Sequence, residues 1–158
     1  MLRRFLPLVV AVAAGCGGAS KPAATAPKSL VEPYIAIQET LARDSLEKLS
    51  ELSAQVVVAA EPVQSQAGVG EVVAGAGRVA AQDIDTARAG FQKMSMGLIT
   101  YLKGHADQRN GYEVVFCPMA FNNKGAYWVQ KTGEIVNPYH GMMMLHCGDK
   151  VTWDKAPG

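Results

Sequence analysis

The stretch that decides the fold is DIDTARAGFQKMSMGLITYLKG, residues 83–104. Asp83 or Asp85 can cap its amino-terminal end, and Gly104 is a typical stop signal, because glycine adopts the left-handed conformation that closes helices. Between these signals apolar residues recur every three or four positions, namely at Ala87, Phe91, Met94, Leu98 and Tyr101. The pattern predicts an amphipathic helix to about residue 103, with Met94 as filler of the hydrophobic core.

Helical periodicity also fills the chain before this stretch. From residue 29 to about residue 56 apolar residues recur at helical spacing, and Asp44 can cap a second segment, so we expect either two helices or one bent helix. Residues 71–82, EVVAGAGRVAAQ, predict another helix, although Gly75 and Gly77 each weaken it by about 1 kcal/mol. Small residues there allow close approach of a neighbouring helix. Three or four helices with short links predict an antiparallel bundle.

After residue 110 the helical pattern ends. Residues 112–116 and 126–130 have the composition of short strands, and a loop with Asn122, Asn123 and Gly125 joins them. We therefore predict a mainly α fold: an antiparallel helical bundle with a small C-terminal β-hairpin and loop cap. The length of 158 residues fits one domain with a core of its own.

The first residues are typical of an export signal. Two arginines precede an apolar stretch at residues 5–14, and the following AAGC motif resembles a bacterial lipobox, in which the cysteine is acylated and becomes the new N-terminus. This resemblance implies a lipoprotein signal peptide at residues 1–15, the lipidated Cys16 with a flexible tether at residues 16–28, and a single helical domain at residues 29–158. It also implies the periplasmic face of the outer membrane, because Gly17 is not the aspartate that retains lipoproteins at the inner one. An ordinary secretory signal cut nearby is the alternative.

Charge and motifs exclude several classes of function. Lys and Arg total 15 against 14 Asp and Glu, which gives no electrostatic reason to expect nucleic-acid binding. No apolar run reaches the roughly 18 residues of a spanning helix, so we expect membrane contact only through a lipid on Cys16. Nucleophile-elbow, metalloprotease, phosphate-loop and c-type haem motifs are absent from the sequence, and we expect no enzyme.

The last third of the chain holds nearly every soft metal ligand. These residues are Cys117, Cys147, Met119, Met142, Met143, Met144, His105, His140 and His146. Thiolate and thioether sulfur favour Cu(I), and imidazole can complete such a site. A hydrophobic core normally takes Leu or Ile in preference to flexible methionine, so core packing does not explain the cluster.

Local geometry indicates how these sulfurs converge. Pro118 favours an extended residue before it, so Cys117 and Met119 are expected to share one face. Met144 and Cys147 lie three residues apart, which brings them together on a helical turn. Two loops that each supply a Cys and a Met make a sulfur-rich site of two to four ligands. A Cys117–Cys147 disulfide is an equal alternative, which closes a loop of about 30 residues and stabilises the fold by roughly 3–4 kcal/mol.

Three motifs in this region resemble a bacterial domain of unknown function: CPMA at residues 117–120, GAYW at 125–128 and NPYHGMMMLHCG at 137–148. That domain is often attached to the C-terminal end of periplasmic adaptor subunits of copper/silver efflux pumps, or stands alone in secreted proteins and lipoproteins. The resemblance covers about residues 30–150. It implies a shared sulfur set of Cys117, Met119, Met144 and Cys147. This chain departs from the family at position 140, where it has His in place of an aromatic residue, whereas Met142, Met143 and His146 fill variable positions.

These observations predict a lipid-anchored periplasmic protein that binds copper, as Cu(I), for metal tolerance or delivery. Its expected partners are the membrane, through Cys16, and a metal efflux or acceptor protein. The expected ligands are the thiolates of Cys117 and Cys147 and the thioethers of Met119 and Met144, with His146 as an optional further ligand. We expect Asn137, Pro138 and Gly141 to shape the loop, and Trp128 and Tyr139 to exclude water. The alternative is a structural or interaction module of the cell envelope that binds no metal and is locked by a Cys117–Cys147 disulfide.

Overall fold

The computed structural model describes residues 29–158, so the predicted signal peptide and tether lie outside the described residues. The fold is mainly α, as predicted. Four long helices follow one another in the first two thirds of this part: α1 (Val31–Ala42), α2 (Leu49–Ala60), α3 (Val69–Val79) and α4 (Ile84–Gly104). The stretch that begins at residue 29 therefore forms two helices. Asp44 does not cap the second of them, because α2 begins after Lys48.

Helix α4 matches its sequence signals closely. The Asp83 carboxylate accepts a hydrogen bond from the Thr86 amide at 2.8 Å, which is the cap predicted at this end. The helix ends at Gly104, the predicted stop. Its apolar stripe is buried throughout, including Met94, which has no exposed surface.

Helices α3 and α4 pack at very short range because glycines face each other across the crossing. A Cβ atom on Gly75 would lie 2.5 Å from Met94 Cγ and 2.6 Å from the Gly90 carbonyl oxygen. One on Gly90 would lie 2.7 Å from the Val79 amide nitrogen. The small residues that weaken α3 as an isolated helix thus permit the close approach that the sequence predicted.

The C-terminal third forms a three-stranded antiparallel sheet in the order β2-β1-β3. Its strands are β1 (Tyr112–Cys117), β2 (Ala126–Lys131) and β3 (Asp149–Val151). The first two were predicted, with β1 and β2 each extending one residue further. The prediction of a two-stranded hairpin missed β3, which pairs with the other edge of β1. A three-residue strand has too few positions for an alternating pattern to reveal it.

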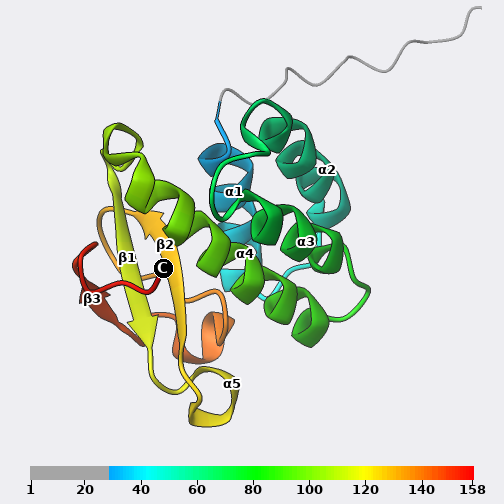
Figure 1. Cartoon of the computed structure of the whole chain (residues 1–158). Helices are drawn as coiled ribbons and strands as arrows, with labels where there is room; N and C mark the ends of the chain where they lie inside the picture. Colours follow the sequence, from blue (N-terminus) through cyan, green and yellow to red (C-terminus); the bar gives the residue numbers. More distant parts are fainter. Residues whose placement is uncertain (1–28) are drawn as a thin grey trace, which may run out of the picture.

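Short helical turns complete the chain: η1 (Glu61–Val63), η2 (Ala106–Gln108), α5 (Ala120–Asn123) and η3 (Gly141–Met144). Helix α4 lies between the sheet and α3 (Figure 1) and contacts both α3 and β2. One continuous hydrophobic core extends from Leu30 to Ala156 and includes residues of the helices and of the sheet. The sheet therefore packs on the helices as part of the same unit.

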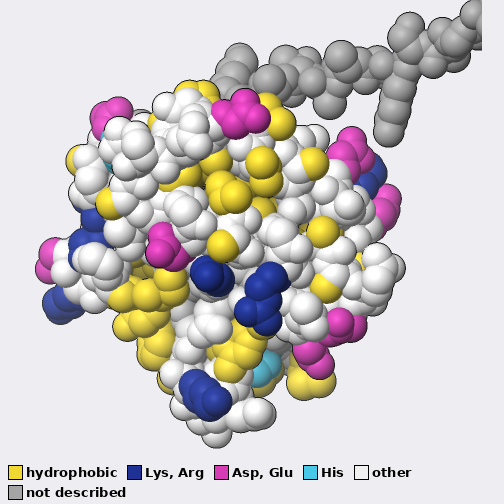
Figure 2. All heavy atoms as spheres, turned by 45° about the vertical axis from the view of Figure 1, so that its right-hand side comes forward, with side chains coloured by type: hydrophobic (Ala, Val, Ile, Leu, Met, Phe, Trp, Pro, Cys, Tyr) yellow, Lys and Arg dark blue, Asp and Glu magenta, His cyan; other side chains and the backbone are white. Residues whose placement is uncertain are grey.

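The surface carries charges of both signs. Figure 2 shows Lys and Arg interspersed with Asp and Glu on the face that it draws, with hydrophobic side chains between them. None of the helices in residues 29–158 combines the length and the apolar character that crossing a bilayer requires.

Candidate metal centre

Two cysteines far apart in the chain meet at one end of the sheet, where its central strand β1 finishes. Cys117 is the last residue of β1 and is fully buried, whereas Cys147 lies two residues before β3 and is half-buried. Their sulfur atoms are 3.0 Å apart, and both thiols are free. The strand that the sequence did not reveal brings them together: Phe116 pairs with Asp149 in an antiparallel register, which places Cys117 opposite Gly148 and next to the adjoining Cys147.

A buried asparagine closes the loop that carries the second thiol. We call residues 137–147 the sulfur loop. Asn137 is fully buried; its side-chain amide donates to the Cys147 carbonyl at 2.7 Å, and its backbone amide donates to the Leu145 carbonyl at 2.7 Å. The Asn137 side-chain oxygen accepts from the amides of Tyr139 at 2.8 Å and His140 at 3.1 Å. These four bonds hold both ends of the loop, which is the shaping role expected of Asn137.

Buried hydroxyl groups tie the sulfur loop to the helices. The Tyr139 hydroxyl donates to the Tyr127 carbonyl in β2 at 2.6 Å and lies 3.3 Å from the Ser95 hydroxyl of α4. Ser95 in turn lies 2.7 Å from the Tyr34 hydroxyl of α1, which accepts from the Val129 amide at 3.1 Å. Burial raises the pKa of both tyrosines well above the usual range, so these hydroxyls stay protonated as donors.

Aromatic side chains pack against one another next to the segment that carries Cys147. The Tyr139 ring packs edge-on against Trp128, with centroids 5.8 Å apart, and against Phe121 at 5.3 Å. Trp128 is fully buried and lies next to Gly148, because a Cβ on that glycine would come within 3.0 Å of the indole ring. Trp128 and Tyr139 are thus both buried next to the segment that carries Cys147.

This environment keeps the Cys147 thiol protonated. Burial raises the pKa of Cys147 to about 11, and the neighbouring Cys117 thiol and the Asp149 carboxylate add to the shift. A carboxylate so close to the pair disfavours a second negative charge. At neutral pH Cys147 is therefore a neutral thiol, and a metal ion that binds there has to displace its proton.

The methionines of the predicted set lie at the surface end of the same two segments. Met119 is 46% exposed, Met142 64% and Met143 86%, whereas Met144 is half-buried. The Cys147 amide donates to the Met144 carbonyl at 3.0 Å, so these two residues close one helical turn, as the spacing predicted. The prediction of an extended segment holds only as far as Cys117. Met119 is in the right-handed helical region (φ −85°, ψ −12°), and the chain turns outward at Pro118.

The histidines are placed differently from one another. His146 is exposed; its Nδ1 lies 2.7 Å from the Ile135 carbonyl oxygen and 3.6 Å from the Glu134 carboxylate, so only Nε2 is left for a ligand. His140 Nε2 is buried and has no hydrogen-bond partner within residues 29–158. His105 stacks on Tyr101 at 4.2 Å at the end of α4.

Two residues that sequence reasoning missed hold the methionine segment in place. Arg88 of α4 donates to the Pro138 carbonyl at 2.9 Å and to the Asp44 carboxylate at 2.5 Å. The second Asp44 oxygen accepts from the Met142 amide at 2.9 Å. The Met142 amide and the Arg88 guanidinium lower the pKa of Asp44, so this anchor is ionised at neutral pH. No local signal pairs Asp44 with Arg88, because 44 positions separate them.

Gly141 shows how closely the loop fits this anchor. Its φ is +56°, in the left-handed region, and a Cβ atom there would collide with the Asp44 carboxylate. Any residue with a side chain would therefore push the loop away from Asp44. The position confirms the expectation that Gly141 shapes the loop.

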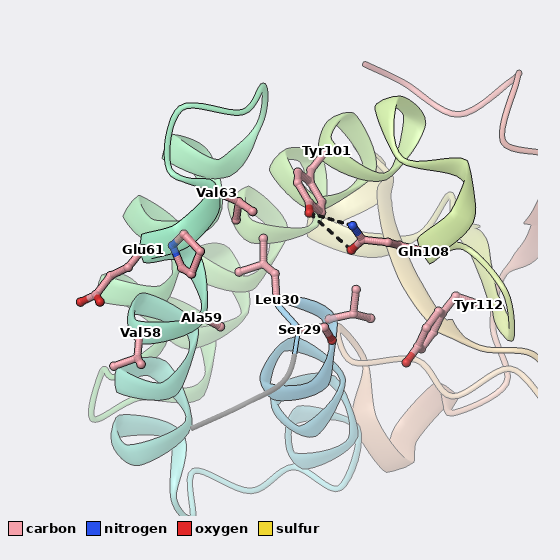
Figure 3. A pocket seen from close by; sticks show the side chains of 11 residues that line it. Ser29, Leu30, Val58, Ala59, Glu61, Val63, Tyr101, Gln108 and Tyr112 are labelled. Carbon is pink, nitrogen blue, oxygen red and sulfur yellow. Dashed lines mark hydrogen bonds between the residues drawn. The ribbon is translucent and has the colours of Figure 1, made fainter. Parts of the chain in front are cut away.

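A cavity lies away from the thiol pair. It has a volume of about 670 Å³ and is formed by the start of α1, the end of α2 and the segment around η2. Figure 3 shows the Tyr101 hydroxyl and the Gln108 amide hydrogen-bonded on one side, with Val58 and Val63 on the other. No thiol, thioether or imidazole is among its lining residues. The thiol pair is therefore the candidate site.

Within the part of the chain that the structure describes, no three His, Cys, Asp or Glu side chains gather as a metal site. The predicted set contains three ligands of this kind, Cys117, Cys147 and the optional His146, and takes the others from methionine. A comparison with protein-family models finds no matching family, and comparisons with curated proteins and with solved structures find no significant match.

Proposed function

We propose that this chain is a periplasmic lipoprotein that binds Cu(I), either for metal tolerance or for delivery to an efflux or acceptor protein. One observation carries the proposal: two free thiols, 30 positions apart in the chain, lie with their sulfur atoms 3.0 Å apart. Thiolate is a preferred ligand of Cu(I). In this proposal the helices act as a bundle scaffold, and the sheet with the sulfur loop is the cap that carries the ligands.

The thiol pair fits a soft ion after a small movement. Two sulfurs bound to one tetrahedral metal at about 2.3 Å lie roughly 3.8 Å apart. From the observed 3.0 Å they have to separate by less than about 1 Å. Cys117 belongs to β1, whereas Cys147 lies in a loop, so the movement falls on the loop. Deprotonation then costs free energy that the metal–thiolate bonds offset.

The exposed methionines favour a metal site over a packing role. Six large apolar side chains are exposed within residues 29–158, and three of them are Met119, Met142 and Met143. All three lie within five residues of a thiol. A thioether is a neutral, soft ligand that needs no deprotonation, so these side chains can bind an arriving Cu(I) ion at any pH. We assign Met119 and Met144 as ligands beside the two thiolates, with His146 Nε2 as an optional further ligand.

The same distance between the Cys117 and Cys147 sulfur atoms also supports a second function. A disulfide has an S–S bond of about 2.05 Å, so the two sulfurs need to approach by only about 1 Å to form one. The chain is then a structural or interaction module of the cell envelope, with a Cys117–Cys147 lock and no metal. This alternative ranks second because it gives the exposed methionines no role.

A Cu(I) titration separates the two functions. The full chain with Cys16→Ser, which leaves two thiols, is reduced and titrated anaerobically with Cu(I) against a chromogenic chelator. We expect one Cu(I) per chain, and loss of binding in the Cys117→Ser and Cys147→Ser variants. The control is Met94→Leu, which changes a buried methionine of α4 and should leave affinity unchanged.

The mass of the same chain purified without reductant completes the test. A mass two units below that of the reduced chain, together with no Cu(I) uptake after mild reduction, overturns the copper proposal and supports the lock. Retained thiols and one bound Cu(I) support the copper proposal.

The predicted anchor requires its own test, because Cys16 lies outside the described residues. We propose acylation at Cys16 and location at the periplasmic face of the outer membrane. Expression of the chain in a bacterium fed with a labelled fatty acid should label the wild type and not Cys16→Ser. Label in both chains, or in neither, would contradict acylation at this residue.

A further inference from the structure

We infer that the thiol pair is also a reductant for Cu(II), converting two Cu(II) ions to Cu(I) while Cys117 and Cys147 form a disulfide, and that the exposed methionines retain the Cu(I) product. This inference deepens the proposed function and rests on its assignment of copper. It explains two features together: thiols that lie closer than a bridging metal requires, and thioethers that stand outside at the surface.

The thiol geometry favours the oxidation. The two sulfurs lie 3.0 Å apart, so an approach of about 1 Å brings them to the bond length of a disulfide, and no other thiol is found among residues 29–158. The reaction between them is intramolecular, so it avoids the encounter of two chains. Cys147 is half-buried and gives an oxidant access to the pair, whereas Cys117 is shielded.

The step balances with Cu(II) as the oxidant. Each thiol loses one proton and one electron, and the two sulfurs share the remaining electrons in a new S–S bond. Two Cu(II) ions take up the two electrons and become two Cu(I) ions, and two protons leave to solvent. The reaction is a single turnover per chain, because a further round needs a thiol reductant to restore the pair.

The product needs ligands that survive this step. Once the disulfide has formed, the thiolates are no longer available, but thioethers are unchanged by it and bind Cu(I). Met119 lies two residues from Cys117, and Met143 lies four residues from Cys147, so their Cα atoms are within roughly 7 Å and 14 Å of those of the cysteines. Their exposure, at 46% and 86%, leaves the sulfur atoms accessible to an ion and to a receiving partner.

The experiment adds a Cu(II) salt to the reduced full chain with Cys16→Ser, anaerobically, with a chelator that is coloured only with Cu(I). We expect two Cu(I) per chain, a mass loss of two units and no covalent dimer. Cys117→Ser and Cys147→Ser should each give at most one Cu(I) per chain, at least about 10-fold more slowly, with disulfide-linked dimers. Wild-type chain that yields no more Cu(I) than the single variants, or that keeps both thiols, overturns the inference.

A methionine variant tests retention separately. Met119→Leu, Met142→Leu and Met143→Leu combined should leave the Cu(I) yield unchanged, while the copper that stays with the oxidised chain after desalting falls at least about 10-fold. Equal retention in this variant and the wild type overturns the role of the thioethers. The matched control is Met94→Leu, which should behave as wild type in both readouts.

The two proposals fail in different experiments. If Cu(I) binds the reduced chain but Cu(II) does not oxidise it, the inference is wrong and the proposed function stands. If Cu(I) does not bind the reduced chain, the proposed function fails, and the mass loss and Cu(I) yield with Cu(II) still decide whether the pair is a reductant.

Discussion

The same residue type has opposite environments in the two halves of this molecule. Met94 in α4 has no exposed surface and packs against Gly75 of α3, whereas Met143 in the sulfur loop is 86% exposed. The helical half uses methionine as a flexible filler of close-packed space. The sulfur loop displays it to solvent, where it buries little apolar surface. The difference indicates that Met142 and Met143 contribute little to packing.

The two halves are also held in place by different forces. Helices α3 and α4 approach each other through Gly75 and Gly90 and are held in place by close packing. The sulfur loop is fixed by hydrogen bonds that the Asn137 and Arg88 side chains donate and that the Asp44 carboxylate accepts. A packed helix crossing resists any change of volume. A loop held by a few polar anchors can move by the roughly 1 Å that a metal or a disulfide requires.

The largest expected effect is the difference in unfolding free energy between truncation of Met94 and truncation of Met143. Met94→Ala should lower the free energy of unfolding by about 2–5 kcal/mol, because it leaves a cavity in a full core. Met143→Ala should change it by less than about 0.5 kcal/mol. Urea unfolding of both variants measures the difference. Similar losses in the two variants would show that Met143 packs against the fold, and the comparison would fail.

Two glycines of α3 allow a test of the close packing between α3 and α4. Gly75→Ala should destabilise the chain by about 1–3 kcal/mol, because its Cβ meets Met94 and the backbone of α4. Gly77→Ala should be neutral or stabilise by up to about 1 kcal/mol, since nothing lies within 4 Å of its Cβ and alanine favours helix. Thermal unfolding compares them. Equal melting temperatures would contradict the tight crossing.

Replacement of the two assigned thioether ligands by leucine tests the ligand assignment without disturbing the hydrophobic core. Met119→Leu with Met144→Leu should weaken Cu(I) binding by at least about 10-fold, or roughly 1.4 kcal/mol, while the melting temperature stays within a few degrees. Competition with a chelator gives the affinity. If the affinity stays within a few-fold of wild type, these methionines are packing residues and the ligand assignment is wrong.

The smallest expected effect concerns the anchor of the sulfur loop. The pKa of Asp44 is lowered in the folded chain, so its ionised form adds stability above the unfolded value of about 3.8. That contribution is lost as the pH falls through the folded pKa. Because the carboxylate is 45% exposed, Asp44→Asn should cost less than about 1 kcal/mol at pH 7. The cost should shrink toward zero below pH 4 in urea unfolding; a cost independent of pH would contradict a charged anchor.

Local patterns predicted the helices, because the apolar spacing, the Asp83 cap and the Gly104 stop all lie within one segment. The same patterns could not give the meeting of Cys117 with Cys147. That contact depends on β3, which is three residues long, and on the register of Phe116 with Asp149. Nor could they pair Asp44 with Arg88, since the two residues are brought together by the packing of α4 on the loop after α1. The ligand chemistry of their side chains identified the sulfur-containing residues in the sequence. Which of them are in contact depends on tertiary structure.

Copper X-ray absorption spectroscopy on the reduced chain with Cys16→Ser, loaded with one equivalent of Cu(I), tests the central claim most directly. If the two thiols and the methionines bind the ion together, the first shell consists of sulfur at about 2.3 Å, and one sulfur is lost when Cys147 is replaced by Ser. A first shell dominated by nitrogen or oxygen, or a spectrum unchanged in Cys147→Ser, would contradict a copper site at the thiol pair.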